Sequence, residues 1–168
     1  HSFLGIHPHT FLPWGEVPST HHSVVESAYS LSRNLRLAQD KIHLIKNLDV
    51  LIIDEISMVR CDLLDAIDLV LRKYRNNQNA FGGVQLLMIG DLFQLPPVVK
   101  DNDARILSQC YPNFYFFESK ALQKCGYHKI ELMHVYRQTD SHFLEILNEI
   151  RHGKLSRKNR EELTNKVE

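Results

Sequence analysis

The chain has no excess of charge of either sign. Its 20 Lys and Arg residues balance 20 Asp and Glu residues over a length of 168 residues. A net charge of zero gives no overall electrostatic argument for binding nucleic acid, an anionic membrane or an acidic substrate, so any contact with DNA has to be local. Hydrophobic residues make up 43% of the chain, which is enough for one globular domain with its own core but hardly for two.

Cysteines and long apolar runs are scarce as well. No C-x-x-C pair is present, so a disulfide framework is not expected, and we predict ordinary buried thiols in a reducing compartment at Cys61, Cys110 and Cys125. No apolar run approaches a membrane span, and the N-terminus lacks the features of a secretory signal. We therefore expect a soluble, cytoplasmic protein without membrane contact, associated with the nucleoid if the source is bacterial. Because the chain starts at His1 without an initiator methionine, we expect an excerpt of a longer protein.

Proline and histidine are concentrated in the first thirty or so residues, a mixture that is unsuited to a continuous helix. We interpret this stretch as an excursion from the core. Its histidines raise an alternative function, a metal-binding module in which His7 with His9, or His21 with His22, ligates Zn²⁺. No cysteine lies near them and their spacing matches no closed tetrahedral framework, so solvated loop histidines are favoured.

From about Gln39 the pattern becomes regular. The run at 50–53 is apolar without alternation, which suits a strand buried on both faces of a parallel sheet. A second apolar strand is expected at 84–89, after a turn region at 76–83. Apolar residues recur at helical spacing between them, which predicts an amphipathic helix over 62–74 with Asp62 as its cap.

Shorter elements complete the pattern. We predict a short helix around Ile42 and Ile45, strands at 114–117 and 129–133, and a helix at 141–151 that Gly153 ends. Apolar strands that alternate with amphipathic helices indicate an α/β domain with a mainly parallel sheet.

Both long strands are followed by acidic residues. Asp54 and Glu55 follow the first strand and Asp91 follows the second. Ligands of such folds bind at the carboxyl ends of the strands, so these acids are expected at one edge of the sheet. Metal-assisted phosphoryl transfer needs one carboxylate to hold Mg²⁺, the role that suits Asp54, and a neighbour to orient or deprotonate water, the role that suits Glu55. The alternative is an ordinary strand-to-loop turn.

The loop after the second strand adds further polar groups. Gly90 permits a close approach of two backbones, and the diproline at 96–97 stiffens the loop. Gln94 is able to hydrogen-bond both a phosphate oxygen and the attacking water. This combination strengthens the interpretation of the strand ends as a nucleotide site.

These residues carry a resemblance to a known family. The segment at 51–58, Leu-Ile-Ile-Asp-Glu-Ile-Ser-Met, resembles the Walker B segment of superfamily 1 DNA helicases in the PIF and RecD-like branch. Four other segments resemble motifs of that branch in the same order. They are the DNA-contacting segment at 1–3, the PIF-type signature at 57–72, the third motif at 90–98 and the fourth motif at 135–138.

The resemblance implies a fold and an activity. Residues 1–168 would form part of the first RecA-like motor domain, a P-loop NTPase type of α/β fold with flanking helices, incomplete at its N-terminus. Residues 4–34 would form a pin-like or wedge-like insertion. The parent would be an ATP-dependent DNA helicase that couples Mg-ATP hydrolysis to translocation along single-stranded DNA and to duplex unwinding, in DNA repair and recombination.

The resemblance also implies a role for each residue of the nucleotide site. Asp54 would bind Mg²⁺ and Glu55 would act as the general base. Gln94 would sense the γ-phosphate and Arg137 would stabilise its charge, both converging with Asp91 on the same edge of the sheet.

Contacts with DNA are expected from three places, namely the segment at 1–3, the insertion and the diproline at 96–97. Single-stranded DNA and duplex junctions are the implied partners of a chain that is itself monomeric. The aromatic candidates at the tip of the insertion could stack on unpaired bases or could simply anchor the loop. The expected DNA-binding residues are His1, Ser2, Phe3, Phe11, Trp14, Pro96 and Pro97.

The chain departs from the family pattern in one respect. No G-x-x-x-x-G-K-[ST] loop, which would cradle the phosphates, is present, and Gly153-Lys154 is better explained as a helix end. We expect that loop upstream of His1, so the chain alone should be inactive and ATP and Mg²⁺ should bind only the longer parent. A nucleotide-free interaction domain descended from a helicase remains the alternative function.

Overall fold

The computed structural model describes residues 4, 10–12, 25–134, 136 and 140–165. They belong to two units, 1–127 and 128–168, each of which is described by itself. The strands are β1 (Thr10–Leu12), β2 (Val25–Ser27), β3 (Val50–Ile53) and β4 (Gln85–Met88). The α-helices are α1 (Ala28–Asn34), α2 (Gln39–Lys46), α3 (Cys61–Arg75), α4 (Asp101–Leu107), α5 (Lys120–Cys125), α6 (Ser141–Arg151) and α7 (Arg157–Asn165). Short 3-10 helices are η1 (Ile56–Met58), η2 (Ala80–Gly83) and η3 (Phe116–Glu118).

The strands pair in parallel, as predicted. β3 pairs with β4 in a register that runs from Val50↔Gln85 to Ile53↔Met88. The expectation that β3 is buried on both faces is wrong, because exposure alternates along both strands. One face packs on the core through Leu51, Ile53, Leu86 and Met88, whereas the described residues leave the other face exposed at Val50, Ile52, Leu87 and Ile89.

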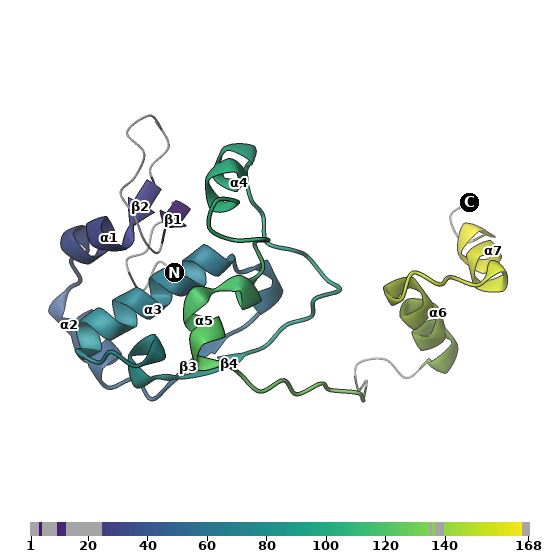
Figure 1. Cartoon of the computed structure of the whole chain (residues 1–168). Helices are drawn as coiled ribbons and strands as arrows, with labels where there is room; N and C mark the ends of the chain where they lie inside the picture. The colour runs from purple at the N-terminus through teal and green to yellow at the C-terminus, as the bar shows by residue number, and fades with distance from the viewer. Residues whose placement is uncertain (1–3, 5–9, 13–24, 135, 137–139, 166–168) are drawn as a thin grey trace. The chain divides into compact units, whose positions relative to one another are not determined.

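Helix α3 lies in the middle of the first unit, between the β3–β4 sheet and the β1–β2 pair (Figure 1). Leu64 and Leu71 are fully buried on it, which confirms the predicted amphipathic helix. It begins at Cys61, with Arg60 as the residue before its first turn, so the prediction of Asp62 as the cap is wrong. The Asp62 carboxylate instead bonds to groups outside the helix.

The described residues among the first thirty are tied to the core more firmly than expected of an excursion. Phe11 on β1 is only 4% exposed, and Leu4 is also buried in the main hydrophobic cluster. β1 and β2 pair in parallel. Parallel neighbours need a connection of about a dozen residues or more, and residues 13–24 supply it.

Two of the predicted strands are wrong. Within 114–117 the structure has the start of η3, and Tyr115 forms only an isolated bridge with Arg60. Residues 129–133 belong to no helix or strand, and the side chains of Ile130 and Leu132 are more than 80% exposed. Aromatic and β-branched residues favour a strand only where a neighbouring strand and a packing surface are present, and the described residues offer neither here.

The second unit contains α6 and α7. Helix α6 spans the predicted residues, and the Asp140 side chain caps it by accepting the amides of His142 and Phe143, both at 3.0 Å. Gly153, with φ of 65°, ends the helix as predicted. The amides of Gly153 and Lys154 donate to carbonyls of the last turn, which is a Schellman motif.

No helix in the described part of the chain is both long enough and apolar enough to cross a membrane.

Candidate nucleotide site

Two acid-bearing turns meet at one edge of the β3–β4 sheet. Because the strands are parallel, their carboxyl ends lie at the same edge. Beyond the strands, the amide of Ile89 donates to the carbonyl of Ile53, and the amide of Ile56 donates to the carbonyl of Ile89, both at 2.9 Å. Asp54 and Asp91 therefore lie at the same edge of the sheet, as predicted.

The turn after β3 has an unusual backbone at Glu55. Its φ of 51° and ψ of 43° are left-handed, a conformation that costs a residue with a side chain about 1–2 kcal/mol. The Glu55 amide donates to Oδ1 of Asp54 at 2.8 Å, which fixes the turn. Both acidic side chains are exposed. The left-handed turn therefore leaves both carboxylates open to solvent at the end of β3.

Gly90 lies where the second turn passes closely by the first. A Cβ at Gly90 would lie 3.0 Å from both the amide nitrogen and Cγ2 of Ile56, and 3.3 Å from the amide nitrogen of Ser57. Distances this short would force the two turns apart. The close approach predicted for Gly90 is confirmed, and it sets the spacing of the two acid-bearing turns.

The turn after β4 folds Gln94 back toward Asp91. Oδ1 of Asp91 accepts the amide of Phe93 at 3.0 Å, and the carbonyl of Asp91 accepts the amide of Gln94 at 3.1 Å. Nε2 of Gln94 lies 3.5 Å from Oδ2 of Asp91. Asp91 is partly buried and Gln94 is exposed, so the amide side chain stands at the same edge as the acids and is open to a ligand.

The donor set of this edge fits a hard divalent cation. Mg²⁺ is bound by one or two carboxylates, with water and substrate phosphates completing its octahedron. Asp54 uses Oδ1 within the turn, and no hydrogen bond to its Oδ2 occurs among the described residues. No group of three metal-ligating side chains forms in that part of the chain, so the protein alone supplies an incomplete ligand set. The buried hydroxyl of Ser57 also lacks a described partner, which leaves polar capacity at this turn.

Several predicted site residues cannot be placed. Arg137, His1, Ser2, Phe3 and Trp14 lie outside the residues that the structure describes. The same holds for the candidate zinc ligands His7, His9, His21 and His22. The convergence of Arg137 on the acidic edge and the contacts of these residues with DNA stay predictions.

The remaining DNA-contact candidates differ in exposure. Phe11 is buried in the core, so its ring is not available to stack on a base, and it anchors the loop instead. Pro96 is exposed and Pro97 is partly buried, in a loop whose Phe93 and Leu95 side chains are each more than 60% exposed. The loop follows Asp91 directly in the chain and presents exposed apolar side chains to solvent.

Comparison with protein families decides the affiliation. The model of the PIF1-like helicase family matches residues 15–161, which include both acid-bearing turns. The chain belongs to the PIF1-like helicase family.

Curated relatives within the PIF1-like family share substantial sequence with the chain. The ATP-dependent DNA helicase RRM3 of Saccharomyces cerevisiae is 45% identical over 107 residues, which are 64% of this chain and 14% of that protein. The human ATP-dependent DNA helicase PIF1 is 40% identical over 110 residues, 66% of this chain and 16% of that protein. The chain thus spans about one seventh of the length of these relatives.

Solved PIF1 structures have the same fold. Bacteroides Pif1 bound to single-stranded DNA is 38% identical with a TM-score of 0.79, and the match covers 98% of this chain and 35% of that one. A Pif1 helicase from Bacteroides in complex with ADP-AlF3 and single-stranded DNA gives a TM-score of 0.81 at 37% identity, over 95% of this chain and 33% of that one. These matches confirm the RecA-like α/β fold.

Sequence reasoning missed a row of buried acids in the PIF1-type signature helix. Asp62, Asp65 and Asp68 of α3 are at most 5% exposed. Asp65 accepts the hydroxyls of Tyr111 and Ser119, both at 2.6 Å, and two backbone amides of α5 at 2.9 and 3.1 Å. The signal was present as three aspartates at a spacing of three residues beside the apolar stripe of one helix, where they cannot all reach solvent.

Each of these aspartates fastens a different segment to α3. Asp68 accepts the amide of Phe81 in η2 at 2.6 Å and pairs with Arg72 at 2.6 Å. Around Asp65, burial and the neighbouring carboxylate raise the pKa of Tyr111 far above its usual range, so its phenol stays a neutral donor. The buried aspartates of the signature helix therefore bind segments that come both before and after it in the chain.

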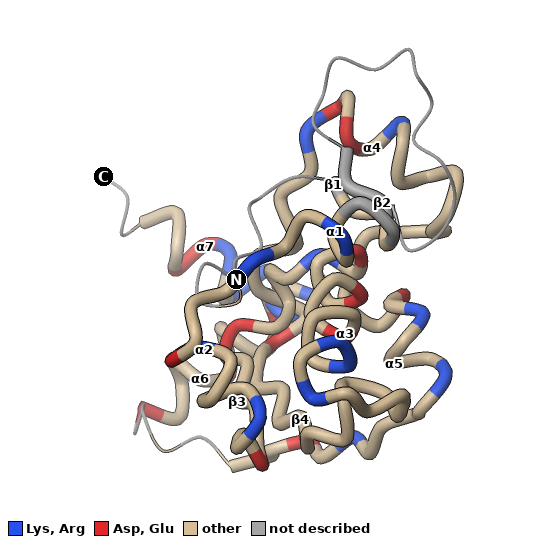
Figure 2. Tube along the Cα trace, turned by 90° about the vertical axis from the view of Figure 1, so that its left-hand side faces the viewer, with Lys and Arg blue, Asp and Glu red and all other residues tan. Residues whose placement is uncertain are grey.

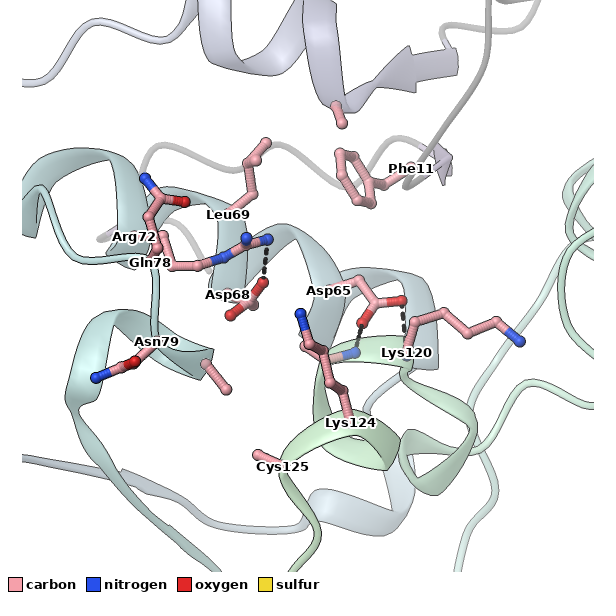
Figure 3. A pocket seen from close by; sticks show the side chains of 13 residues that line it. Phe11, Asp65, Asp68, Leu69, Arg72, Gln78, Asn79, Lys120, Lys124 and Cys125 are labelled. Atoms are coloured by element: carbon pink, nitrogen blue, oxygen red, sulfur yellow. Dashed lines mark hydrogen bonds and ion pairs between the residues drawn. The ribbon is translucent and has the colours of Figure 1, made fainter.

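A hollow of about 390 Å³ lies between α3, α5 and the loop at 78–80 (Figure 3). Asp65 and Asp68 line it, but Figure 3 shows both bound to protein donors, Asp68 to Arg72 and Asp65 to the start of α5. Neither carboxylate is left to hold a ligand there.

Charged positions of both signs are interspersed along the described chain (Figure 2).

Proposed function

We propose that the chain is part of the first motor domain of an ATP-dependent DNA helicase, with residues 4–34 as a strand-separating insertion. The observation that carries the proposal is the shared sheet edge at which Asp54, Glu55 and Asp91 emerge from two parallel strands. Membership of the PIF1-like family supports the same activity. The curated relatives are named ATP-dependent DNA helicases.

The exposed carboxylates of Asp54 and Glu55 have separate roles in the proposed ATP hydrolysis. Asp54 would hold Mg²⁺, which supplies charge neutralisation of the phosphates when bound. Glu55 takes the proton of the attacking water, and Gln94 orients that water and the γ-phosphate. Arg137 offsets the charge that develops on the phosphoryl group. No phosphate loop occurs in these 168 residues, so ATP binding requires a longer protein that provides one.

The proposed partners are single-stranded DNA and duplex junctions. A solved relative is bound to single-stranded DNA, and another complex contains ADP-AlF3 as well. In this chain the exposed loop around Pro96 lies next to the acidic edge and offers apolar side chains to unpaired bases. Such an enzyme works where DNA is accessible, in the cytoplasm, and at the nucleoid if the source is bacterial.

Substitution of Glu55 tests the proposal in the full-length protein. Glu55→Gln keeps the size and one hydrogen-bonding oxygen but removes the basic carboxylate, so ATP binding should persist while DNA-stimulated hydrolysis falls by roughly 10²-fold or more. Steady-state phosphate release with and without single-stranded DNA, paired with equilibrium nucleotide binding, measures both quantities.

Asp40→Asn is the matched control, because Asp40 is an exposed acid in the first turn of α2 and belongs to neither acid-bearing turn. Wild-type turnover in Glu55→Gln would remove this residue from the mechanism. A wild-type protein without DNA-stimulated hydrolysis would favour the alternative function, a nucleotide-free interaction domain.

A further inference from the structure

Ser57 carries a buried hydroxyl at the contact between the two acid-bearing turns. It is the second residue after Glu55, lies in η1 and is only 1% exposed. Its Oγ is buried and has no hydrogen-bond partner in the described part of the chain. A buried polar group without a partner costs free energy and is rare in native proteins, so this hydroxyl calls for a physical explanation.

The backbone around this hydroxyl is fixed. The amide of Met58 donates to the carbonyl of Glu55 at 3.0 Å, which closes the turn of η1. The amide of Ile56 donates to the carbonyl of Ile89 at 2.9 Å, which joins η1 to the end of β4. The hydroxyl of Ser57 can still rotate about its own bonds and turn toward a new acceptor.

η1 is in contact with η3 and with the turn after β4. In η3 the carbonyl of Phe116 already accepts the amide of Ser119 at 3.0 Å. In the turn after β4, a Cβ at Gly90 would lie 3.3 Å from the amide nitrogen of Ser57. Gly90 is exposed, and its carbonyl accepts no hydrogen bond from a described residue. This carbonyl is therefore a neighbouring acceptor that is open to the hydroxyl.

The same turn is held only weakly at its functional amide. Nε2 of Gln94 lies 3.5 Å from Oδ2 of Asp91, which is beyond the usual range of a hydrogen bond. A ligand that binds the exposed Gln94 amide therefore displaces little, and it can draw the turn into a new position.

From this geometry we propose that Ser57 is a positioning residue for ATP hydrolysis. When a γ-phosphate binds Gln94, the turn after β4 closes on η1 and the Ser57 hydroxyl donates to the carbonyl of Gly90. The inference rests on the proposed function and deepens it, because it names the group that holds Gln94 in place. In this arrangement Ser57 touches neither nucleotide nor metal, and its hydrogen bond stabilises the closed turn only while a γ-phosphate is bound.

The experiment uses the full-length protein and compares wild type with Ser57→Ala. The probes are Mg-ADP and Mg-ADP-AlF3, in which aluminium fluoride stands in for the γ-phosphoryl group. Affinity for Mg-ADP should not change, whereas affinity for Mg-ADP-AlF3 should fall by about 5-fold, the scale of one neutral hydrogen bond. DNA-stimulated kcat/KM should fall by a similar factor.

Thermal unfolding without nucleotide separates this role from a merely structural one. Ser57→Ala removes a buried hydroxyl that has no described partner, so the thermal midpoint should stay the same or rise. Loss of a structural contact would lower it.

Two further comparisons isolate the hydroxyl. Ser57→Thr should bind Mg-ADP-AlF3 about 5-fold more tightly than Ser57→Val, which has nearly the same shape but no hydroxyl. Ser108→Ala is the matched control, because Ser108 is an exposed serine at the end of α4 whose hydroxyl donates to the carbonyl of Arg105 at 3.1 Å. It should leave the ratio of the two affinities at the wild-type value.

Two results would overturn this inference alone. One is an unchanged ratio of the two affinities in Ser57→Ala. The other is a lower thermal midpoint of Ser57→Ala without nucleotide, because the hydroxyl would then already be bonded in that state. A wild-type protein that does not bind Mg-ADP-AlF3, or whose hydrolysis does not respond to DNA, would overturn the proposed function, and this inference with it.

Discussion

The carboxylate of Asp65 should be among the most sensitive positions for stability. It is 5% exposed and accepts four hydrogen bonds, from Tyr111, Ser119 and two amides at the start of α5. Asp65→Asn keeps the shape of the side chain but replaces one acceptor oxygen with an N–H donor. Each oxygen accepts one hydroxyl and one backbone amide. Whichever oxygen is replaced, the hydroxyl beside it can rotate to accept the new N–H, whereas the backbone amide can only donate and loses that acceptor.

The magnitude follows from these bonds. A hydrogen bond to a charged group contributes about 1.5–3 kcal/mol, and a buried donor left unpaired costs about 1–3 kcal/mol. Asp65→Asn should therefore lower the free energy of unfolding by about 3 kcal/mol or more, a large part of the roughly 5–15 kcal/mol that holds a domain together. Tyr111→Phe removes one bond and should cost about 1.5 kcal/mol.

Urea unfolding followed by circular dichroism measures these differences as shifts of the midpoint at constant slope. Asp40→Asn, at an exposed acid of α2, is the control and should stay within about 0.5 kcal/mol of wild type. A loss below about 1 kcal/mol for Asp65→Asn would refute the reasoning, because the four bonds would then add little beyond what water supplies.

The other predictions concern thiols and a histidine. Cys125 is exposed and should react first with a thiol reagent. Cys61 is fully buried and burial raises its pKa to about 12, so it should react only when the protein unfolds. Equal labelling rates of the two thiols by mass spectrometry would contradict this. In the second unit, the hydrogen bond and the charge of Glu162 raise the pKa of His142. The stabilisation from this contact is therefore fully present below the unfolded pKa of about 6.5, and it is lost as the pH rises through the folded pKa. Glu162→Gln should lower the His142 pKa in an NMR titration, and an unchanged pKa would count against the contact.

Elements with a clear local period were predictable. The strands at 50–53 and 85–88 and helices α3 and α6 follow from apolar spacing and end signals that are contained within each segment. The acidic edge followed as well, because parallel strands place their carboxyl ends together whatever surrounds them.

Features that depend on distant partners were not predictable. Asp62 has the residue type of a cap, but its acceptor oxygens are taken by Arg60 and by Phe11, 51 positions away. The aromatic run at 114–117 has the composition of a strand but finds only an isolated bridge among the described residues. Cys125 was expected to be buried and is exposed. Such outcomes are decided by tertiary neighbours that a local pattern does not contain.

The buried acid at the centre of α3 imposes an order on folding while the chain is being synthesised. Asp65 leaves the ribosome long before its donors, since Tyr111 follows 46 positions later and Ser119 follows 54 positions later. Until these residues have emerged, burying that face of α3 would place an ionised carboxylate in the core without partners. The nascent helix must therefore keep Asp65 in contact with water, and its final docking waits until α5 has been made.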